Sequence, residues 1–172
     1  YLEKNLLNPN NISLNLDAWI YKAGLPDNCP KIESVLFNNV DEVLNDFYLT
    51  GKINSIKTDS WSTHEYLHFI RGLVDSTSID QMSIIDNKLN FTSSGNSEIA
   101  CAWFEKSIYF GYNEIDDNLE KFLIKIGRRK FLQPLYTALA STNEGKEKAI
   151  AIYRKARDNY HYISYNTVDR IL

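Results

Sequence analysis

The feature that most constrains the fold is a series of amphipathic helical patterns that follow one another from Lys31 to the end of the chain. In each segment apolar residues recur three and four positions apart, the spacing that places them on one face of a helix. No segment alternates apolar and polar residues convincingly enough to indicate a β-strand. Because short connectors between such helices imply antiparallel neighbours, the sequence predicts an all-α protein built as a layer of stacked helical hairpins. The segments are 31–51, 61–74, 78–87, 98–110, 114–126, 130–139 and 149–156, the last beyond a break at Gly145, and the tail adds a turn or a short helix.

Several helix boundaries can be assigned from the sequence. Ser62 and Glu65 have the spacing of a capping box, in which each residue accepts a hydrogen bond from the other's backbone N–H. Trp61 and Tyr66 flank this start as a hydrophobic staple. Asn96 is an N-cap for the segment 98–110, which is apolar almost all round and is therefore predicted to be central.

The first thirty residues differ from the rest. Residues 1–16 have only weak helical spacing interrupted by Pro9, and residues 17–30 contain one glycine and two prolines, which favours an irregular connector. We therefore expect residues 1–30 to be an N-terminal arm or linker and residues 31–172 to be one helical domain. The chain begins at Tyr1 rather than at methionine, so we expect it to be an excised fragment.

Composition excludes several classes of protein. Its 19 Lys and Arg against 22 Asp and Glu provide no chain-wide basic surface, so we expect no nucleic-acid partner. Cys29 and Cys101 lie far apart without metal-type spacing, which favours buried thiols over a disulfide framework or a cysteine-based zinc site. No stretch has the apolar length of a membrane span and no signal peptide is evident. We expect a cytoplasmic protein with no membrane partner.

The stretch "GRRKFLQP", Gly127 to Pro134, departs from the helix rules that its neighbours obey. Gly127 is predicted to stop the preceding helix, and the next helix is predicted to open near Lys130 to Gln133 with Pro134 in its first turn. That start carries Arg128, Arg129 and Lys130 and no acid, although cations are unfavourable at the positive end of the helix dipole. The pattern indicates a local site for an anion such as a carboxylate. The alternative is a solvated basic turn without a ligand.

The segment "HEYLH" matches the H-E-x-x-H pattern, in which two histidines on one helical face bind zinc. Glu65 already has a structural function in the capping box, and a catalytic zinc needs a third protein ligand. The gluzincin spacing from His68 reaches Asn87 rather than a glutamate, and His161 lies far along the chain. The sequence therefore favours a capped helix with two polar histidines, and His64 with His68 remains the weaker metal alternative.

Four segments together resemble the C-terminal domain of the leukotriene-A(4) hydrolase/aminopeptidase family of zinc metallopeptidases. They are "DAWIYKAGLP" at 17–26, "NSEI" with Trp103 at 96–103, "GRRKFLQPLY" at 127–136 and the tail from "YHYIS" onward. The resemblance is clearest from Asn96 to the end and poor between Pro30 and Ser60.

The resemblance implies an armadillo-like superhelix of stacked antiparallel helices, packed against a catalytic domain that precedes it in the same polypeptide. The zinc site of the family lies in that preceding domain, so the resemblance implies zinc in the full-length enzyme and no cofactor or catalytic residue in this chain. The domain would wall the substrate cleft, and Arg128 and Lys130 match the residues that bind the free carboxylate of a short peptide substrate. Arg129 adds a charge whose role stays open.

Two functions from different classes follow. The first is the C-terminal helical domain of a zinc aminopeptidase, which removes N-terminal residues from peptides and is not catalytic alone. The alternative is a helical scaffold that binds another protein through a groove, a common use of stacked helices.

Overall fold

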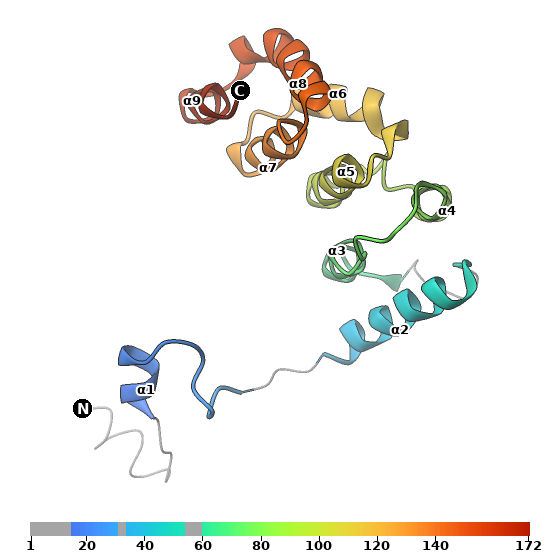
Figure 1. Ribbon diagram of the computed structural model, residues 1–172, viewed down its shortest axis with the longest axis vertical. Helices are drawn as coiled ribbons and strands as arrows, with labels where there is room; N and C mark the ends of the chain where they lie inside the picture. The colour runs from blue at the N-terminus through green and yellow to red at the C-terminus, as the bar shows by residue number, and fades with distance from the viewer. Residues whose placement is uncertain (1–14, 31–33, 54–59) are drawn as a thin grey trace. The chain divides into compact units, whose positions relative to one another are not determined.

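The computed structural model describes residues 15–30, 34–53 and 60–172. All regular structure in these ranges is helical, which confirms the predicted fold class. The helices appear in chain order in Figure 1. Their bounds are α1 Leu16–Tyr21, α2 Val35–Thr50, α3 Thr63–Arg71, α4 Ile79–Leu89, α5 Ser97–Phe110, η3 Asn113–Ile115, α6 Asp116–Lys125, α7 Arg129–Leu139, α8 Asn143–Ala156, η4 Arg157–Asn159 and α9 Tyr162–Ile171.

Contacts divide the chain into two units, residues 1–34 and residues 35–172. The described part of the first unit contains α1, whose Ala18 is buried. The prediction of an irregular connector from residue 17 was therefore wrong for residues 17–21, which belong to the six-residue helix Leu16–Tyr21. The weak helical spacing expected in residues 1–14 lies outside the described residues.

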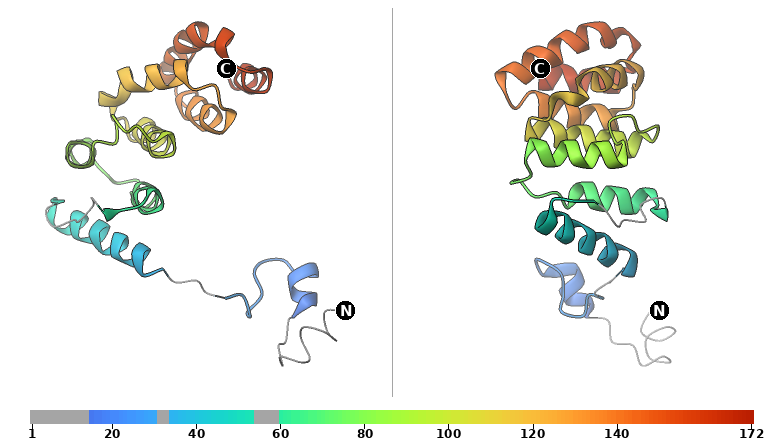
Figure 2. Two further views of the ribbon diagram at one scale, coloured as in Figure 1. Left: turned by 180° about the vertical axis from the view of Figure 1, so that it is seen from behind. Right: turned by 90° about the vertical axis from the view of Figure 1, so that its right-hand side faces the viewer.

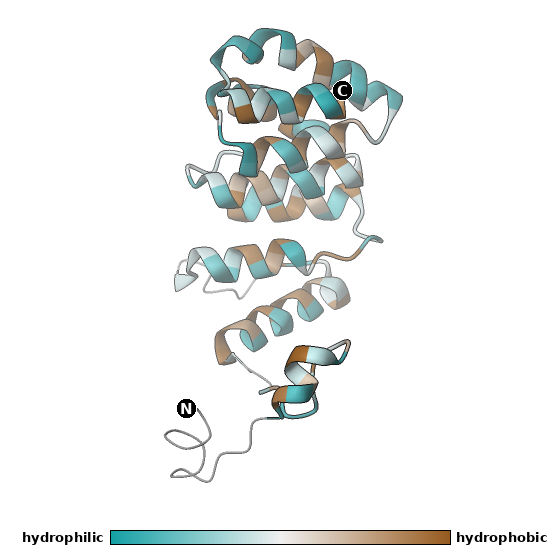
Figure 3. Ribbon diagram, turned by 90° about the vertical axis from the view of Figure 1, so that its left-hand side faces the viewer, coloured by the Kyte–Doolittle hydropathy of each residue, from teal (hydrophilic) through white to brown (hydrophobic). Residues whose placement is uncertain are grey.

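The second unit stacks its helices in two layers. In one layer α3 packs on α5, α5 on α7 and α7 on α9, while α6 packs on α8 in the other. Figure 1 and the reverse view in Figure 2 show these layers as two columns of helices that alternate along the chain. Apolar residues, brown in Figure 3, occur along each helix among polar ones, as expected for helices that bury one face.

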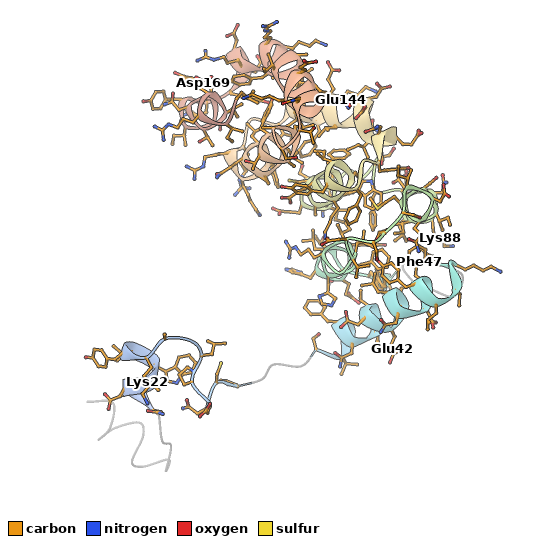
Figure 4. The ribbon with its side chains drawn as sticks, in the orientation of Figure 1. Lys22, Glu42, Phe47, Lys88, Glu144 and Asp169 are labelled. Atoms are coloured by element: carbon orange, nitrogen blue, oxygen red, sulfur yellow. The ribbon has the colours of Figure 1, made fainter. Side chains whose placement is uncertain are left out.

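A continuous core runs between the layers, and its largest fully buried side chain is Trp103 on α5. The Trp103 ring packs on Phe91, with ring centroids 5.2 Å apart, and its Nε1 donates a hydrogen bond of 2.9 Å to Thr92 Oγ1. In Figure 4 the buried Phe47 points from α2 toward the helices that follow, whereas the exposed Glu42 points away. The central position predicted for residues 98–110 is confirmed, because α5 buries residues on several sides.

Helix starts agree with the sequence in most cases. The capping box at α3 is present, with Ser62 N–H donating to Glu65 Oε2 over 2.9 Å, and Trp61 packs edge-on against Tyr66. Asn96 caps α5 by accepting from the N–H of Glu98.

Gly145 does not break a helix, contrary to the sequence prediction. It is the third residue of α8, and its N–H donates to Oγ1 of the N-cap Thr142 over 3.0 Å. A Cβ atom at this position would lie 2.3 Å from the carbonyl oxygen of Leu139. Glycine is therefore needed for the close approach of α8 to the end of α7, and not for a turn.

The tail forms a helix of ten residues, α9, which confirms the short helix predicted there. Arg157 and Asp169 hold it to the preceding turn through two hydrogen bonds of 3.2 and 2.8 Å. Tyr153 donates a third hydrogen bond to Asp169, over 2.6 Å. None of the described helices is both long and apolar enough to cross a membrane.

Candidate functional site

Helix α7 begins without the usual stabilising groups. Arg128 is its N-cap, with extended backbone angles and no side-chain hydrogen bond to the helix, and the first turn contains no acid. The absence of acid predicted from the sequence is thus a property of the real helix start. The helix opens at Arg129, slightly before the predicted opening, so Pro134 lies in the second turn rather than in the first. Because proline has no N–H, the carbonyl of Lys130 lacks its helical partner.

Gly127 is not the helix stop that the sequence predicted. Helix α6 ends at Lys125, and Ile126 already has extended backbone angles. Gly127 does not have a positive φ, so it does not adopt the left-handed conformation of a glycine helix stop. Its carbonyl oxygen accepts a hydrogen bond of 2.7 Å from Ser164 Oγ on α9. The turn before α7 is thus fixed by a contact with the last helix of the chain.

The three cations at this start have different surroundings, although all are exposed. The Arg128 guanidinium lies 5.9 Å from the centroid of the Phe131 ring, and among the described residues it forms no ion pair. Lys130 Nζ lies 2.5 Å from Oε1 of Glu98 on α5 and 5.6 Å from the Phe131 centroid. The side chain of Arg129 forms no ion pair within the described ranges.

A groove of about 400 Å³ begins at Lys130 and follows the layer formed by α3, α5 and α7. Its walls combine apolar and charged side chains. They include Ile70, Arg71, Asp75, Glu98, Cys101, Ala102, Glu105, Lys106, Tyr109, Phe110, Lys130, Phe131 and Pro134. Arg128 does not line it, so the structure places Lys130 at the groove and Arg128 beside it.

The Cys101 thiol lies in the wall of this groove and is buried, as the sequence predicted. Burial, followed by the negative charges of Glu105 and Glu98, raises the pKa of this thiol to about 12, against a smaller opposing effect of Lys130. The thiol therefore stays protonated and is a poor nucleophile. Cys29, by contrast, is only half-buried, so burial was wrongly predicted for it.

Sequence reasoning missed Glu98 as a partner of Lys130. The two residues lie on different helices and are 32 positions apart, so no local pattern connects them. Glu98 did occur within the "NSEI" segment that carried the family resemblance. That segment was the one available signal.

Comparison with known families gives the identity of the fold. The family model described as "Leukotriene A4 hydrolase, C-terminal" matches residues 61–172, which include α3 to α9 and the whole groove. The chain belongs to this family. The match begins at the capped helix α3 and includes both Arg128 and Lys130.

Curated relatives are longer than this chain. It is 25% identical to leucine aminopeptidase 2-2 of Scheffersomyces stipitis, over 93% of this chain and 28% of that protein. It is 27% identical to leucine aminopeptidase 2 of Aspergillus niger, over 92% of this chain and 26% of that protein. The chain thus spans about a quarter of the length of the curated relatives it matches.

A solved structure supports the fold. Native yeast LTA4 hydrolase superimposes with a TM-score of 0.77 over 98% of this chain and 30% of that chain, at 20% sequence identity. The armadillo-like superhelix implied by the resemblance is therefore confirmed for this member of the leukotriene A4 hydrolase C-terminal family.

In this family member, His68 and Glu65 of "HEYLH" make contacts within the helical fold, and His64 is exposed. His68 Nε2 lies 2.7 Å from Asp41 Oδ1, and its ring stacks on Phe37 with centroids 4.4 Å apart. His64 is exposed, and the carboxylate of Glu65 is engaged in the capping box. Within the described ranges, no group of three or more His, Cys, Asp or Glu side chains could hold a metal ion. These residues do not fit a zinc site.

Proposed function

We propose that this chain is the C-terminal helical domain of a zinc aminopeptidase, in which it walls the substrate cleft and binds the free carboxylate of a short peptide. Arg128 and Lys130 are the residues that bind the carboxylate. The zinc and the catalytic groups belong to a preceding domain of the same polypeptide, and residues 1–30 form the arm that leads to it. The chain is not catalytic by itself.

The observation that carries this proposal is the exposed Arg128 at the N-cap of α7, without an acid in the first turn and without an ion pair among the described residues. A free guanidinium offers a planar pair of donors that matches a carboxylate. The unpaired backbone N–H groups and the helix dipole of α7 attract the same negative charge. An anion at this point would therefore interact with both the Arg128 guanidinium and the N-terminal end of α7, neither of which has an acidic partner among the described residues.

Lys130 has a second function in the proposal. One of its donors is taken by Glu98, which leaves the ammonium group with two others for a substrate. Its position in the groove wall, two residues from Arg128, supports a contact with the peptide residue whose carboxylate Arg128 binds. Fixing the carboxylate sets the register of a short peptide, so that its other end reaches the reacting groups in a constant position.

The proposal is tested by kinetics of the full-length polypeptide that carries this chain. Arg128→Ala should lower kcat/KM for a tripeptide with a free carboxylate by about ten- to a hundredfold, since a charge-assisted hydrogen bond is worth about 1.5–3 kcal/mol. The corresponding tripeptide amide lacks the charge and should lose little. Arg128→Lys, which keeps the charge but loses the planar fork, should give an intermediate value.

Arg154→Ala is the matched control, because Arg154 is exposed on α8 and its removal changes net charge equally. It should leave both substrates unaffected. If Arg128→Ala changes the free acid and the amide by the same factor, the assigned role is wrong. If it changes neither, the basic turn has no ligand.

A further inference from the structure

The groove continues beyond Lys130 along one side of α5. Glu98, Cys101 and Glu105 are spaced by three and four residues, so they lie on the same helical face, and all three line the groove. The wall between the two acids is apolar, with Ala102, Phe131 and Pro134 contributing to it. The groove therefore has a carboxylate at each end of an apolar stretch.

The two carboxylates have different partners. Glu98 is paired with Lys130. Glu105 is half-buried and forms no ion pair with any described residue. Its negative charge, together with that of Glu98, adds to the effect of burial in raising the pKa of the Cys101 thiol between them.

The groove also contains the charged residues Arg71, Asp75 and Lys106. Lys106 donates to the carbonyl oxygen of Leu73 over 3.0 Å and lies 5.3 Å from the Phe110 ring centroid. Arg71 and Asp75, an exposed pair of opposite sign, belong to the end of α3 and the turn after it. Among the described residues, neither Arg71 nor Lys106 forms an ion pair with Glu105. Of the two acids on the α5 wall, Glu105 is therefore the one without an ion-pair partner among the described residues.

We infer that this groove binds the side chain of the substrate's C-terminal residue, and that Glu105 makes it selective for lysine. The inference rests on the proposed function, because it takes Lys130 as a carboxylate ligand. In this arrangement the C-terminal carboxylate lies at Lys130, the aliphatic stem crosses the apolar stretch, and the ammonium group reaches Glu105. Nothing covalent changes, so the effect is one of binding and position.

Length supports lysine over a shorter cation. Glu98 and Glu105 are separated by about 10 Å along α5, at about 1.5 Å per residue. An extended lysine measures about 7 Å from its carboxyl carbon to its ammonium nitrogen, given bonds of about 1.5 Å. With a charge-assisted hydrogen bond of about 2.8 Å at each end it spans about 13 Å. That length is comparable with the separation of Glu98 and Glu105 along α5.

The test uses the full-length polypeptide and three tripeptides that differ only in the third residue: lysine, norleucine or glutamate, each as free acid and as amide. Norleucine keeps the aliphatic stem without the charge. Among the free acids we expect kcat/KM to fall from lysine to norleucine to glutamate, by about threefold at each step, as for partly exposed ion pairs. Glu105→Gln should bring lysine and norleucine to the same value. Glu147→Gln, on the exposed face of α8, should leave the order unchanged.

The outcomes separate the two proposals. If free acids exceed amides but the third residue makes no difference, or if Glu105→Gln keeps the preference for lysine, the groove inference is wrong and carboxylate binding stands. If free acids and amides have equal kcat/KM in the unmutated enzyme, both proposals are overturned. A thermal unfolding curve equal to that of the unmutated protein shows that Glu105→Gln has not acted through folding.

Discussion

Two consecutive helices of this domain begin in opposite ways. At α8, Thr142 caps the helix by accepting from the Gly145 N–H, and Glu144 adds a negative charge to the first turn. At α7, Arg128 occupies the cap position without capping, and no acid follows in the first turn. The starts are only fourteen residues apart and belong to the same stack of helices.

The α7 and α8 starts differ in how much they contribute to the stability of the folded chain. The Thr142 cap and the Glu144 charge at the α8 start both stabilise the folded chain. The α7 start does the reverse, because it places cations at the positive end of the helix dipole and omits a cap. The carboxylate ligand proposed above would supply the negative charge that the α7 start lacks and the α8 start has. The comparison therefore predicts that repair of the α7 start will increase stability and reduce function.

The largest effect is expected from Arg128→Ser, which gives α7 the type of cap that α8 has. A serine cap should raise the free energy of unfolding by about 1 kcal/mol, measured by urea denaturation of the 172-residue chain. The same change removes the guanidinium and should lower kcat/KM of the full-length enzyme for free-acid tripeptides by about ten- to a hundredfold.

Thr142→Ser is the matched control for this variant, since it changes the cap of α8 while preserving the hydroxyl acceptor. It should change neither stability nor kcat/KM appreciably. Should Arg128→Ser lower stability, the α7 start is not the destabilised element that the comparison requires.

A second, smaller effect is expected at the α8 start. In Gly145→Ala the added Cβ would lie 2.3 Å from the Leu139 carbonyl oxygen and 2.9 Å from Thr142 Oγ1. Such overpacking costs about 1–3 kcal/mol, and the higher helix propensity of alanine offsets up to about 1 kcal/mol of it. We expect a net loss of about 1–2 kcal/mol in the free energy of unfolding, without a specific effect on free-acid substrates.

Gly95→Ala is the control, because a Cβ there has no atom within 4 Å and the backbone has no positive φ. Equal stability of the two glycine variants would contradict the close approach of α8 to α7.

The same two helix starts show how far the sequence could predict this fold. Local rules located most elements, because a capping box such as Ser62 with Glu65 is formed by residues near in the chain. They failed at Gly145, where the reason for glycine is the carbonyl of Leu139 on the previous helix. They failed at Gly127 for a similar reason, since Ile126 already ends the helix and Ser164 fixes the turn from α9.

The candidate site was predictable in its charges and not in its surroundings. Arg128 and Lys130 stood out because their sign is wrong for a helix start, which is a local property. The pairing of Lys130 with Glu98 and the groove beside them depend on the packing of α5 against α7. No spacing along the chain encodes that packing. The position of Glu105 in the groove, without an ion pair to any residue that the structure describes, therefore could not be predicted from the sequence.

The smallest effect concerns salt and isolates the charge at the α7 start. Arg128→Ala removes the cation without adding a cap. The variant therefore lacks the repulsion between the guanidinium and the helix dipole, and this loss contributes to its free energy of unfolding relative to the unmutated chain. Such terms are about 0.3–1 kcal/mol at low ionic strength and are screened at about 1 M salt, where the Debye length is about 3 Å. Arg128→Ala also removes the favourable contact of the guanidinium with the Phe131 ring, which lowers the free energy of unfolding. Because this contact is of short range, salt screens it less than the interaction with the dipole. We therefore expect the difference in free energy of unfolding, Arg128→Ala minus unmutated, to be more positive at about 0.05 M than at about 1 M salt.

Arg154→Ala on α8 provides the reference, because Arg154 lies in the last turn, where a cation is favourable and the salt dependence has the opposite sign. Identical salt dependence for the two variants would show that α7 and α8 do not differ electrostatically, and the destabilised start of α7 would then rest on its missing cap alone.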